Sequence, residues 1–411
     1  MELLMVAACV QGGLVYAAYR LADSGRVPLN MGTLVAVALL VRLPFVFASP
    51  LLSDDIHRYL FDGRVQQAGE SPYAFSPKAY PTTDPIVSDL AAKVNHPGLV
   101  TLYPPGAQLF FRLAAPFGLI GMKGLLVTAD MVGVGLLLFF LTRQGLPGSR
   151  AVLYAWNPLV IWEIAWSGHI DALALPFLLG AGMWATGTGR RQVALAGGLF
   201  ALAFWVKLMP VIFIPFFLFA ARRRVGWFVA GGAVASMFLV VPYLPHSGNA
   251  FKTLWLYGST WEFSGFLFCL FRDLTGMNLA ARLATAVLFC CGAGGVLYRQ
   301  WRTGLSLFEC LGWAASFWLL TTPTLHPWYG LYLALFLPLM GGAARDIIAP
   351  YLLTLTPLLG YGVLTNFLAR GVWDEGVWIP FWIFFIPVCA WVVGWHRATG
   401  EKSKSKPPAA R

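Results

Sequence analysis

Apolar runs, each close to twenty residues long, follow one another through most of the chain and set the strongest limit on its fold. A hydrocarbon layer about 30 Å thick needs about twenty apolar residues in a helix that spans it. Of the 411 residues, 58% are hydrophobic and only 11% are charged, against about a quarter in an average soluble domain. The sequence therefore predicts an all-α polytopic membrane protein with a bundle of about thirteen (11–13) helices. The candidate spans include 151–167, and also 192–207 and 209–221, which only KLMP separates.

Basic residues between the apolar runs indicate which ends face the cytoplasm, because cytoplasmic loops are enriched in Lys and Arg. Under one threading of the chain, the cytoplasmic loops and tail hold Arg143, Arg150, Arg190, Arg191, Arg222, Arg223, Arg224, Arg299, Arg302, Arg345, Lys402, Lys404 and Lys406. This assignment of the spans requires that residues 103–119 lie on the opposite face of the membrane and do not cross the bilayer. We expect 1–396 to form a single transmembrane domain, 49–122 to form a long extracytoplasmic catalytic loop with interfacial helices, and 397–411 to form a basic cytoplasmic tail.

The densest group of charges directly follows an apolar span, in SDDIHRYLFDGRVQQAGESPY at 53–73. If this stretch is helical, Asp54 and Arg58 lie four residues apart, as do Arg58 and Asp62, so their side chains share one region of the helix surface. A carboxylate beside a cation stays ionised, which suits a general base that takes a proton from a hydroxyl. The alternative is a salt-bridged cap, in which Ser53 and Asp54 only close the helix N-terminus.

The sequence carries no P-loop, HExxH or convincing GxSxG motif beside this acidic loop. Because nucleotides are scarce outside the cytoplasm, a transferase on that face needs a substrate activated in the lipid, such as a sugar on a polyprenyl phosphate. The net charge of +11 comes mainly from the cytoplasmic side. It indicates contact with anionic lipids rather than with nucleic acid.

The acidic stretch resembles the first extracytoplasmic loop of GT-C glycosyltransferases, in particular bacterial membrane mannosyltransferases that use polyprenyl-phosphate mannose. Other segments agree in the same order: LYPPGAQLF at 102–110, WNPLVIWEIAWSGHIDALAL at 156–175, WVKLMP, and LHPWYGLYLALFLPL at 325–339. The resemblance covers most of the chain up to residue 340. Its DD-x-x-RY-x-x-DG core is more specific for the superfamily than for the sugar. It implies a GT-C-like transmembrane bundle and an inverting transfer of a sugar, mannose by family preference, from a lipid phosphate.

The resemblance also implies roles for single residues. Asp54 matches the first acidic position of the family motif and is the expected general base, while Asp55 is expected to position the acceptor or neighbouring groups. Negative charge on the leaving phosphate calls for nearby donors, and the residues expected to bind the donor phosphate or sugar are Arg58, Arg64, Lys207, His169, Asp171 and His326. Asp62, Tyr59 and Glu163 are expected to support them. The alternatives are a lysine that extends to the nearest interface and, for the histidines and Asp171, interfacial anchors or caps.

Two adjacent carboxylates alone do not indicate a metal site. We therefore predict no metal and no other cofactor, although some members of the superfamily use a divalent metal. Arg42, Asp130, Glu163 and Glu309 lie within apolar runs, where a charge is costly, and we expect them to face the bundle interior. Asp130 and Glu309 are also candidates for structural partners of Arg42 or of helix backbone.

Two other functions also fit a polytopic chain with charges inside its spans. One is a transporter or flippase of a lipid-linked sugar, which predicts matched halves of an inverted repeat; the sequence has no visible halves of this kind. The other is a polymerase or ligase of surface glycans. The expected partners are a lipid-linked sugar donor, membrane lipids, and a glycan, glycolipid or protein acceptor. We expect the reaction on the extracytoplasmic face of the plasma membrane, and a pentose stays open as the transferred sugar.

Overall fold

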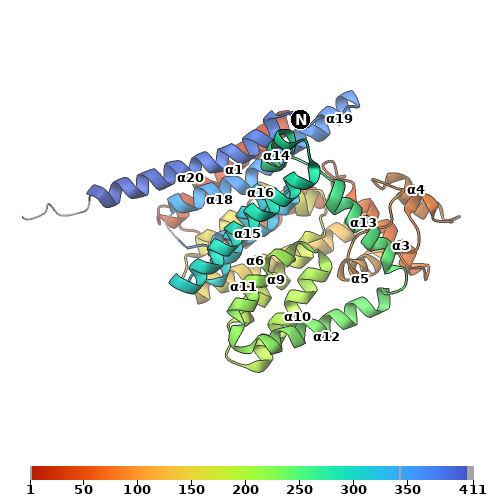
Figure 1. Cartoon of the computed structure of the whole chain (residues 1–411), viewed down its shortest axis with the longest axis horizontal. Coiled ribbons are helices and arrows are strands. Elements are labelled where there is room, and N and C mark those ends of the chain that lie inside the picture. Colours follow the sequence, from red (N-terminus) through yellow and green to blue (C-terminus); the bar gives the residue numbers. More distant parts are fainter. Residues whose placement is uncertain (1, 342–343, 405–411) are drawn as a thin grey trace, which may run out of the picture.

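The computed structural model describes residues 2–341 and 344–404 and is built of helices (Figure 1). The α-helices are α1 Glu2–Asp23, α2 Met31–Phe47, α3 Asp55–Gln67, α4 Pro85–Lys93, α5 Pro105–Ala114, α6 Gly118–Arg143, α7 Val152–Ala155, α8 Pro158–Val160, α9 Asp171–Ala185, α10 Arg190–Val206, α11 Ile214–Ala220, α12 Val225–Val240, α13 Ser247–Thr260, α14 Phe266–Thr275, α15 Asn278–Thr303, α16 Leu307–Thr321, α17 Gly330–Phe336, α18 Ala344–Leu355, α19 Tyr361–Arg370 and α20 Trp378–Lys404. Within the described ranges no strand forms, and only isolated bridges join Phe263 and Ser264 to Thr324. The all-α prediction is confirmed.

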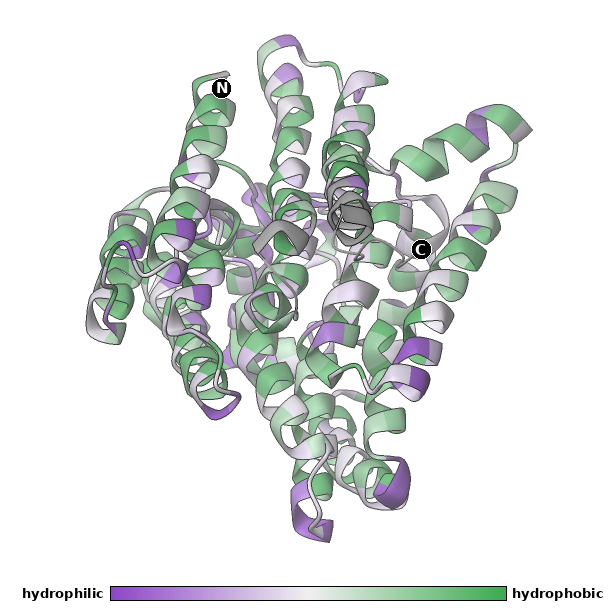
Figure 2. Cartoon of the chain, turned by 90° about the vertical axis from the view of Figure 1, so that its left-hand side faces the viewer, coloured by the Kyte–Doolittle hydropathy of each residue, from purple (hydrophilic) through white to green (hydrophobic). Residues whose placement is uncertain are grey.

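Several helices have the length and composition of membrane spans. In the described part of the chain, five are long and apolar enough to cross a membrane: Leu3–Asp23, Pro105–Arg143, Arg222–Tyr243, Asn278–Thr303 and Ile347–Arg370. Shorter apolar helices cover Met31–Phe47, Asp171–Ala185, Met209–Ala220, Leu307–Thr321, Pro327–Leu339 and Trp378–Gly394. Apolar residues dominate these helices, and hydrophilic residues gather mainly at helix ends and turns (Figure 2). These features support an integral membrane protein.

The apolar run 151–167 is not one continuous helix, contrary to the expected span. Asn157 lies at the break, where its side-chain oxygen accepts from the backbone N–H of Leu159, and Pro158 begins α8. The chain then continues as a π-helical segment, Ile161–Trp166. Such segments are rare and frequently occur at functional sites. Glu163 lies on this segment and is fully buried.

The expected extracytoplasmic loop holds α3, α4 and α5, which pack together at the right of Figure 1. A Cβ on Gly63 of α3 would overlap the backbone of Phe111 in α5, so this glycine permits the close contact. Gly118, with φ of +65°, ends the turn after α5. Because this conformation favours glycine, the chain turns here and divides the apolar stretch Pro105–Arg143 into α5 and α6.

A buried ion pair joins α2 to α6. Arg42 Nε lies 2.6 Å from Asp130 Oδ2, and the Tyr154 hydroxyl donates to Asp130 Oδ1 at 2.5 Å. The guanidinium also donates to two backbone carbonyls. Asp130 is therefore a structural partner of Arg42, and Glu309 is a partner of helix backbone, because it forms a capping box with Ser306 at the start of α16.

The last helix extends into the expected tail, 397–411. α20 continues past residue 396 to Lys404. Residues 405–411 of the expected tail lie outside the described residues.

Candidate active site

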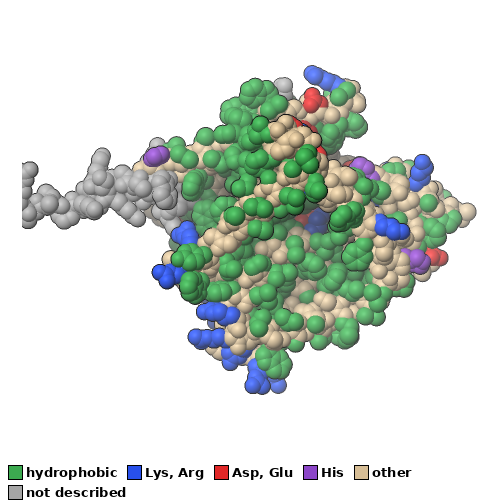
Figure 3. All heavy atoms as spheres, in the orientation of Figure 1, with side chains coloured by type: hydrophobic (Ala, Val, Ile, Leu, Met, Phe, Trp, Pro, Cys, Tyr) green, Lys and Arg blue, Asp and Glu red, His purple; other side chains and the backbone are tan. Residues whose placement is uncertain are grey.

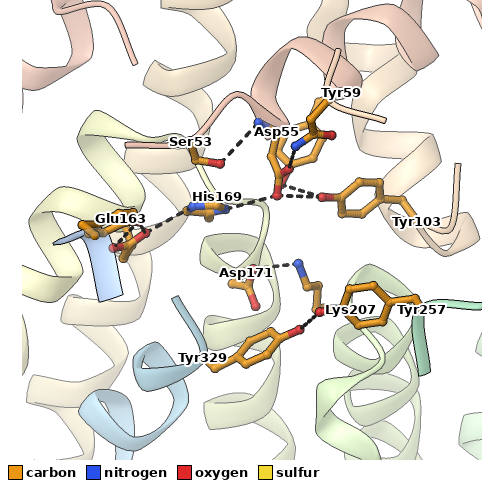
Figure 4. A network of polar contacts seen from close by, with 12 residues as sticks. Ser53, Asp55, Tyr59, Tyr103, Glu163, His169, Asp171, Lys207, Tyr257 and Tyr329 are labelled. Atoms are coloured by element: carbon orange, nitrogen blue, oxygen red, sulfur yellow. Dashed lines mark hydrogen bonds and ion pairs between the residues drawn. The ribbon is translucent and has the colours of Figure 1, made fainter. Parts of the chain in front are cut away.

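Asp55 begins α3 and points into a network of polar side chains (Figure 4). The Asn95 amide donates to Asp55 Oδ1 at 2.9 Å, and the Tyr103 hydroxyl donates to Oδ2 at 3.0 Å. The Ser53 hydroxyl accepts from the backbone N–H of Asp55 at 3.3 Å. The Asp55 side chain is 16% exposed. A ligand can therefore reach part of a carboxylate that is otherwise held in place by donors.

The two adjacent aspartates have different surroundings. Burial alone would raise the pKa of Asp55, but His169, Lys207 and two side-chain hydrogen bonds together lower it. Asp54 is the exposed N-cap residue of α3, and its side chain makes no cap hydrogen bond. Partial loss of hydration, and then the charge of Asp55, raises the pKa of Asp54. Asp55 is thus the carboxylate that is both held in the network and stabilised in its ionised form.

A glycine turn brings the SGHID sequence to this network. Gly168 has φ of +77°, a conformation that favours glycine, and a Cβ there would also collide with Ile56 of α3. The chain therefore turns sharply between the π-helical segment and α9, which Asp171 begins. His169 and Asp171, on either side of Ile170, are both fully buried.

His169 lies between two carboxylates (Figure 4). Its Nε2 is 3.2 Å from Glu163 Oε2, and its Nδ1 is 3.8 Å from Asp55 Oδ2. The Trp328 ring stacks on the imidazole, with centroids 4.1 Å apart. Both oxygens of Glu163 lie 2.9 Å from the hydroxyl of Tyr361. A line of polar groups therefore extends from Tyr361 in α19 to Asp55 in α3.

Lys207 reaches the network because α10 ends beside it. Lys207 is the extended C-cap residue of α10, and Pro210 follows in the next 3-10 turn. A proline cannot continue a helix without loss of a hydrogen bond. The Lys207 ammonium lies 3.3 Å from Asp171 Oδ2 and 5.2 Å from the centre of the Tyr103 ring. The predicted break at KLMP is confirmed.

The YPPG sequence at 103–106 explains how Tyr103 comes to lie beside Lys207. Pro104 and Pro105 begin α5. A Cβ on Gly106 would lie 2.7 Å from the carbonyl oxygen of Trp205 in α10. Since glycine has no Cβ, the backbones of α5 and α10 approach closely. Tyr103, just before α5, therefore lies beside Lys207, just after α10.

The LHPWY sequence forms another wall of the site. The His326 ring stacks on Trp328, with centroids 4.3 Å apart, and the hydroxyls of Tyr329 and Tyr257 lie 2.8 Å apart. Burial lowers the pKa of His326 to about 3, despite the charge of nearby Asp55. His326 is therefore neutral at ordinary pH and offers hydrogen bonds without positive charge.

Three predicted site residues lie farther along α3, away from this network. Arg58 donates to two backbone carbonyls of the loop before α5 and so holds that loop. Asp62 is buried against a glutamine of α5, and burial raises its pKa to about 6. Arg64 lies in the last turn of α3. Tyr59, in contrast, joins the network, because its hydroxyl is 3.3 Å from that of Tyr103.

An apolar groove of about 800 Å³ lies between α13 and the start of α15. Its lining residues are Phe251, Leu254, Trp255, Gly258, Ser259, Thr260, Asn278, Leu279 and Arg282. The first four recur at helical spacing and share one face of α13. Tyr257 lies on another face of the same helix and contacts the site. Arg282 donates to two backbone carbonyls at the C-terminal end of α13, so this end of the groove is polar and cationic.

Sequence reasoning missed several members of the network. Tyr103 lies within LYPPGAQLF, a segment that signals it, whereas Asn95, Tyr257 and Tyr361 belong to no recognisable motif. Their contacts arise from the packing of distant segments, which a single sequence does not reveal. In the described ranges, no group of three His, Cys, Asp or Glu side chains is placed to share a metal ion.

Comparison with known proteins gives a match for the first half of the chain. Residues 1–223 match the family described as alpha-(1->6)-mannopyranosyltransferase, N-terminal domain. No curated protein and no solved structure gives a significant match. The matched region contains Asp55, His169 and Lys207, whereas Trp328 and Tyr361 lie beyond it.

Proposed function

The chain belongs to the alpha-(1->6)-mannopyranosyltransferase family, and from this premise we propose that it transfers mannose from a polyprenyl-phosphate donor to an acceptor hydroxyl, with inversion at the anomeric carbon. Family membership confirms the predicted glycosyltransferase class; the donor, the face and the residue roles are our proposal. The observation that carries the mechanism is the setting of Asp55, a partly exposed carboxylate that accepts hydrogen bonds from Asn95 and Tyr103. His169 and Lys207 help to lower the pKa of Asp55.

We assign the role of general base to Asp55 rather than to Asp54. Asp55 takes the proton of the acceptor hydroxyl while the hydroxyl oxygen bonds to the anomeric carbon of the donor. The bond from that carbon to the phosphate oxygen breaks, and its electron pair leaves with the polyprenyl phosphate. Because attack comes from the side opposite the leaving group, an alpha product requires a beta-linked donor.

Lys207 is placed to stabilise the leaving phosphate. A lysine ammonium has three N–H donors, and the pair with Asp171 occupies one of them at 3.3 Å. Its side chain is 14% exposed, whereas that of Asp171 is buried, so the remaining donors can face a bound anion. Fixed cations at the position where negative charge develops lower the barrier for departure.

The groove between α13 and α15 supports a lipid donor. An isoprenoid chain needs an apolar surface next to the bilayer, and its phosphate needs a cation at the end of that surface. Phe251 and Trp255 supply apolar surface that is otherwise exposed, at 67% and 78%. Arg282 supplies a guanidinium at the polar end, and only part of its set of five N–H donors is used by the protein.

The distribution of charge supports an extracytoplasmic site in a GT-C-like bundle. Lys and Arg side chains gather along the lower left edge of the molecule (Figure 3), while α3, α4 and α5 lie at the opposite side. A basic edge of this kind is typical of the cytoplasmic side of a membrane protein. On this basis we place Asp55 and the rest of the site on the extracytoplasmic face.

The test is product analysis with the purified protein in lipid nanodiscs. We expect a new alpha-(1->6) mannosyl bond from beta-linked polyprenyl-phosphate mannose and a membrane glycan extract, detected by mass spectrometry and linkage analysis. Movement of labelled donor across the bilayer without a new glycosidic bond would instead indicate a flippase. Transfer from a diphosphate-linked oligosaccharide would indicate a ligase.

The same assay separates the two aspartates. Asp55→Asn removes the ionised carboxylate but keeps the shape of the side chain, so we expect donor binding to persist and transfer to fall by about 100-fold or more. Asp54→Asn, the matched control one residue away, is expected to keep most of the activity. The opposite pattern would transfer the role of base to Asp54, and full activity of both variants would exclude the mechanism.

A further inference from the structure

We propose that His169 and Glu163 form a buried proton relay behind Asp55: His169 receives the proton that Asp55 takes from the acceptor, and Glu163 holds the imidazole in the form that can accept it. The inference rests on the proposed function and deepens it. The side chains of His169 and Glu163 are 0% exposed, so both residues act through Asp55 and never touch the substrate. This role differs from the direct binding of sugar or phosphate expected for His169 from the sequence.

The position of Glu163 favours one imidazole nitrogen as the site of the proton. An ionised carboxylate only accepts hydrogen bonds. Glu163 has two neighbours able to donate, the Tyr361 hydroxyl at 2.9 Å and His169 Nε2 at 3.2 Å. We assign the proton of the neutral imidazole to Nε2, the nitrogen nearer a carboxylate, so that Nδ1 faces Asp55. In this form His169 carries no charge, and Lys207 and the hydrogen bonds alone lower the pKa of Asp55.

The protonated imidazole is stabilised on three sides. Glu163 lies at Nε2, Asp55 lies at Nδ1, and the Trp328 ring stacks on the imidazole at 4.1 Å. Two carboxylates and the face of an indole all favour a cation between them. Lys207 acts in the opposite sense, and the pair that its ammonium forms with Asp171 at 3.3 Å reduces this opposing effect.

The proton passes along the relay in two steps. Asp55 first takes the proton from the acceptor hydroxyl, as the new glycosidic bond forms. The gap of 3.8 Å between Asp55 Oδ2 and His169 Nδ1 exceeds hydrogen-bonding distance, and catalytic contacts often shorten only when substrate is bound. The neutral carboxyl group then gives its proton to Nδ1, which yields an imidazolium and restores the Asp55 carboxylate. After product leaves, the proton returns through Asp55 to water.

The local backbone supports a dedicated role for Glu163. A buried carboxylate inside an apolar run is costly, and the chain departs from regular α-helix at this point to form the π-helical segment Ile161–Trp166. The chain then turns at Gly168, and this turn places His169 against the carboxylate of Glu163. The two irregular features together bring Glu163 and His169 into contact and place His169 beside Asp55.

The test substitutes Glu163 by Gln. The substitution removes the negative charge beside Nε2, and the amide can donate an N–H to that nitrogen, so an Nε2 proton is no longer enforced and the imidazolium loses one of its stabilising partners. We expect kcat for mannosyl transfer to fall by about 100-fold or more, with KM for polyprenyl-phosphate mannose unchanged within about twofold. Glu163→Asp retains a carboxylate and should recover at least about tenfold of the loss. Tyr361→Phe, which removes one donor to Glu163 and keeps the ring, should lower kcat by a smaller factor, again without a change in KM.

The control is Asp130→Asn, because Asp130 is a second fully buried carboxylate but belongs to the pair with Arg42. It should lower thermal stability and the yield of folded protein while the remaining protein keeps the wild-type kcat. Wild-type kcat in both Glu163→Gln and Tyr361→Phe would overturn the relay and leave the proposed function intact. Equal activity of Glu163→Asp and Glu163→Gln would also overturn it. Absence of mannosyl transfer by the wild-type protein would instead overturn the proposed function.

Discussion

The reactivity of the Asp55 carboxylate depends on the donors that hold it. Burial raises the cost of its charge, whereas His169, Lys207 and the hydrogen bonds from Asn95 and Tyr103 reduce that cost and lower the pKa of Asp55. A carboxylate stabilised in this way stays ionised in acid, so it is ready to accept a proton over a wide pH range. The same donors also weaken it as a base, which is why a second proton acceptor behind it is useful.

Tyr103→Phe tests this balance, because it removes one hydrogen bond and keeps the ring that faces Lys207. Loss of a bond that favours the ionised form raises the pKa of Asp55. Transfer requires the ionised form of Asp55. As the pH falls, the variant therefore loses activity at a higher pH than the wild type does. We expect the acid limb of the pH profile of kcat/KM to move upward. Tyr351→Phe removes a buried hydroxyl bonded elsewhere and should leave the limb in place; a similar shift in both variants would contradict the assignment.

Irregular helix ends supply most of the active-site side chains. The break at Asn157, the π-helical segment, the Gly168 turn and the end of α10 at Lys207 all interrupt apolar segments. In a membrane protein, interrupted helices are tolerated where the free backbone groups are buried in protein or line a polar cavity. The last three of these interruptions border one network, the place where we propose that the chemistry occurs.

Gly106→Ala tests whether close packing of α5 on α10 positions the site. The added Cβ would lie 2.7 Å from the Trp205 carbonyl oxygen, so the helices must separate. We expect a loss of about 1–3 kcal/mol in stability, and a fall in kcat because Tyr103 and Lys207 move apart. Gly124→Ala in α6 meets nothing within 4 Å and should be neutral or stabilising. Equal behaviour of the two variants, measured by thermal unfolding and transfer assays, would refute this role of Gly106.

On the scale of the whole molecule, α13 separates two environments. Tyr257 on one face contacts the active site, and Phe251, Trp255 and Gly258 on another face line the groove. A donor that places its isoprenoid in the groove and its sugar in the site must pass the C-terminal end of this helix, where Arg282 lies. The arrangement predicts that changes in the groove alter the KM for donors with long lipid chains and leave the KM for donors with short chains unchanged.

Gly258→Trp fills the groove without a clash at its first atom, since a Cβ there meets nothing within 4 Å. We expect KM for a full-length polyprenyl donor to rise by about tenfold, equivalent to about 1.4 kcal/mol of binding. KM for a donor with a two-isoprene chain should change little. Gly248→Trp, on the same helix but outside the groove, is the control. An equal KM for the long donor in both variants would separate the groove from donor binding.

The sequence was informative where chemistry depends on local patterns. Apolar runs predicted the helical membrane architecture. The DD, SGHID, KLMP and LHPWY motifs pointed to Asp54, Asp55, His169, Asp171, Lys207 and His326. The structure holds Asp55 rather than Asp54 in the network. Arg58 and Asp62 were also expected in the site, but Arg58 contacts the loop before α5 and Asp62 contacts α5, because helical spacing does not reveal what packs against each face. Tyr361 and Asn95 could not be predicted, since each meets its partner through contacts between segments far apart in the chain.

The pairing of Arg42 with Asp130 has a consequence for biogenesis. The two residues are 88 positions apart, so α2 emerges from the ribosome well before its counter-ion exists. An unpaired arginine at the bilayer centre costs about 2.5–3.5 kcal/mol. Until α6 is synthesised, α2 must stay beside the insertion machinery or hold Arg42 near the lipid headgroups. We therefore expect α2 and α6 to assemble together, and a truncated nascent chain that stops before α6 to be degraded faster than one that includes it.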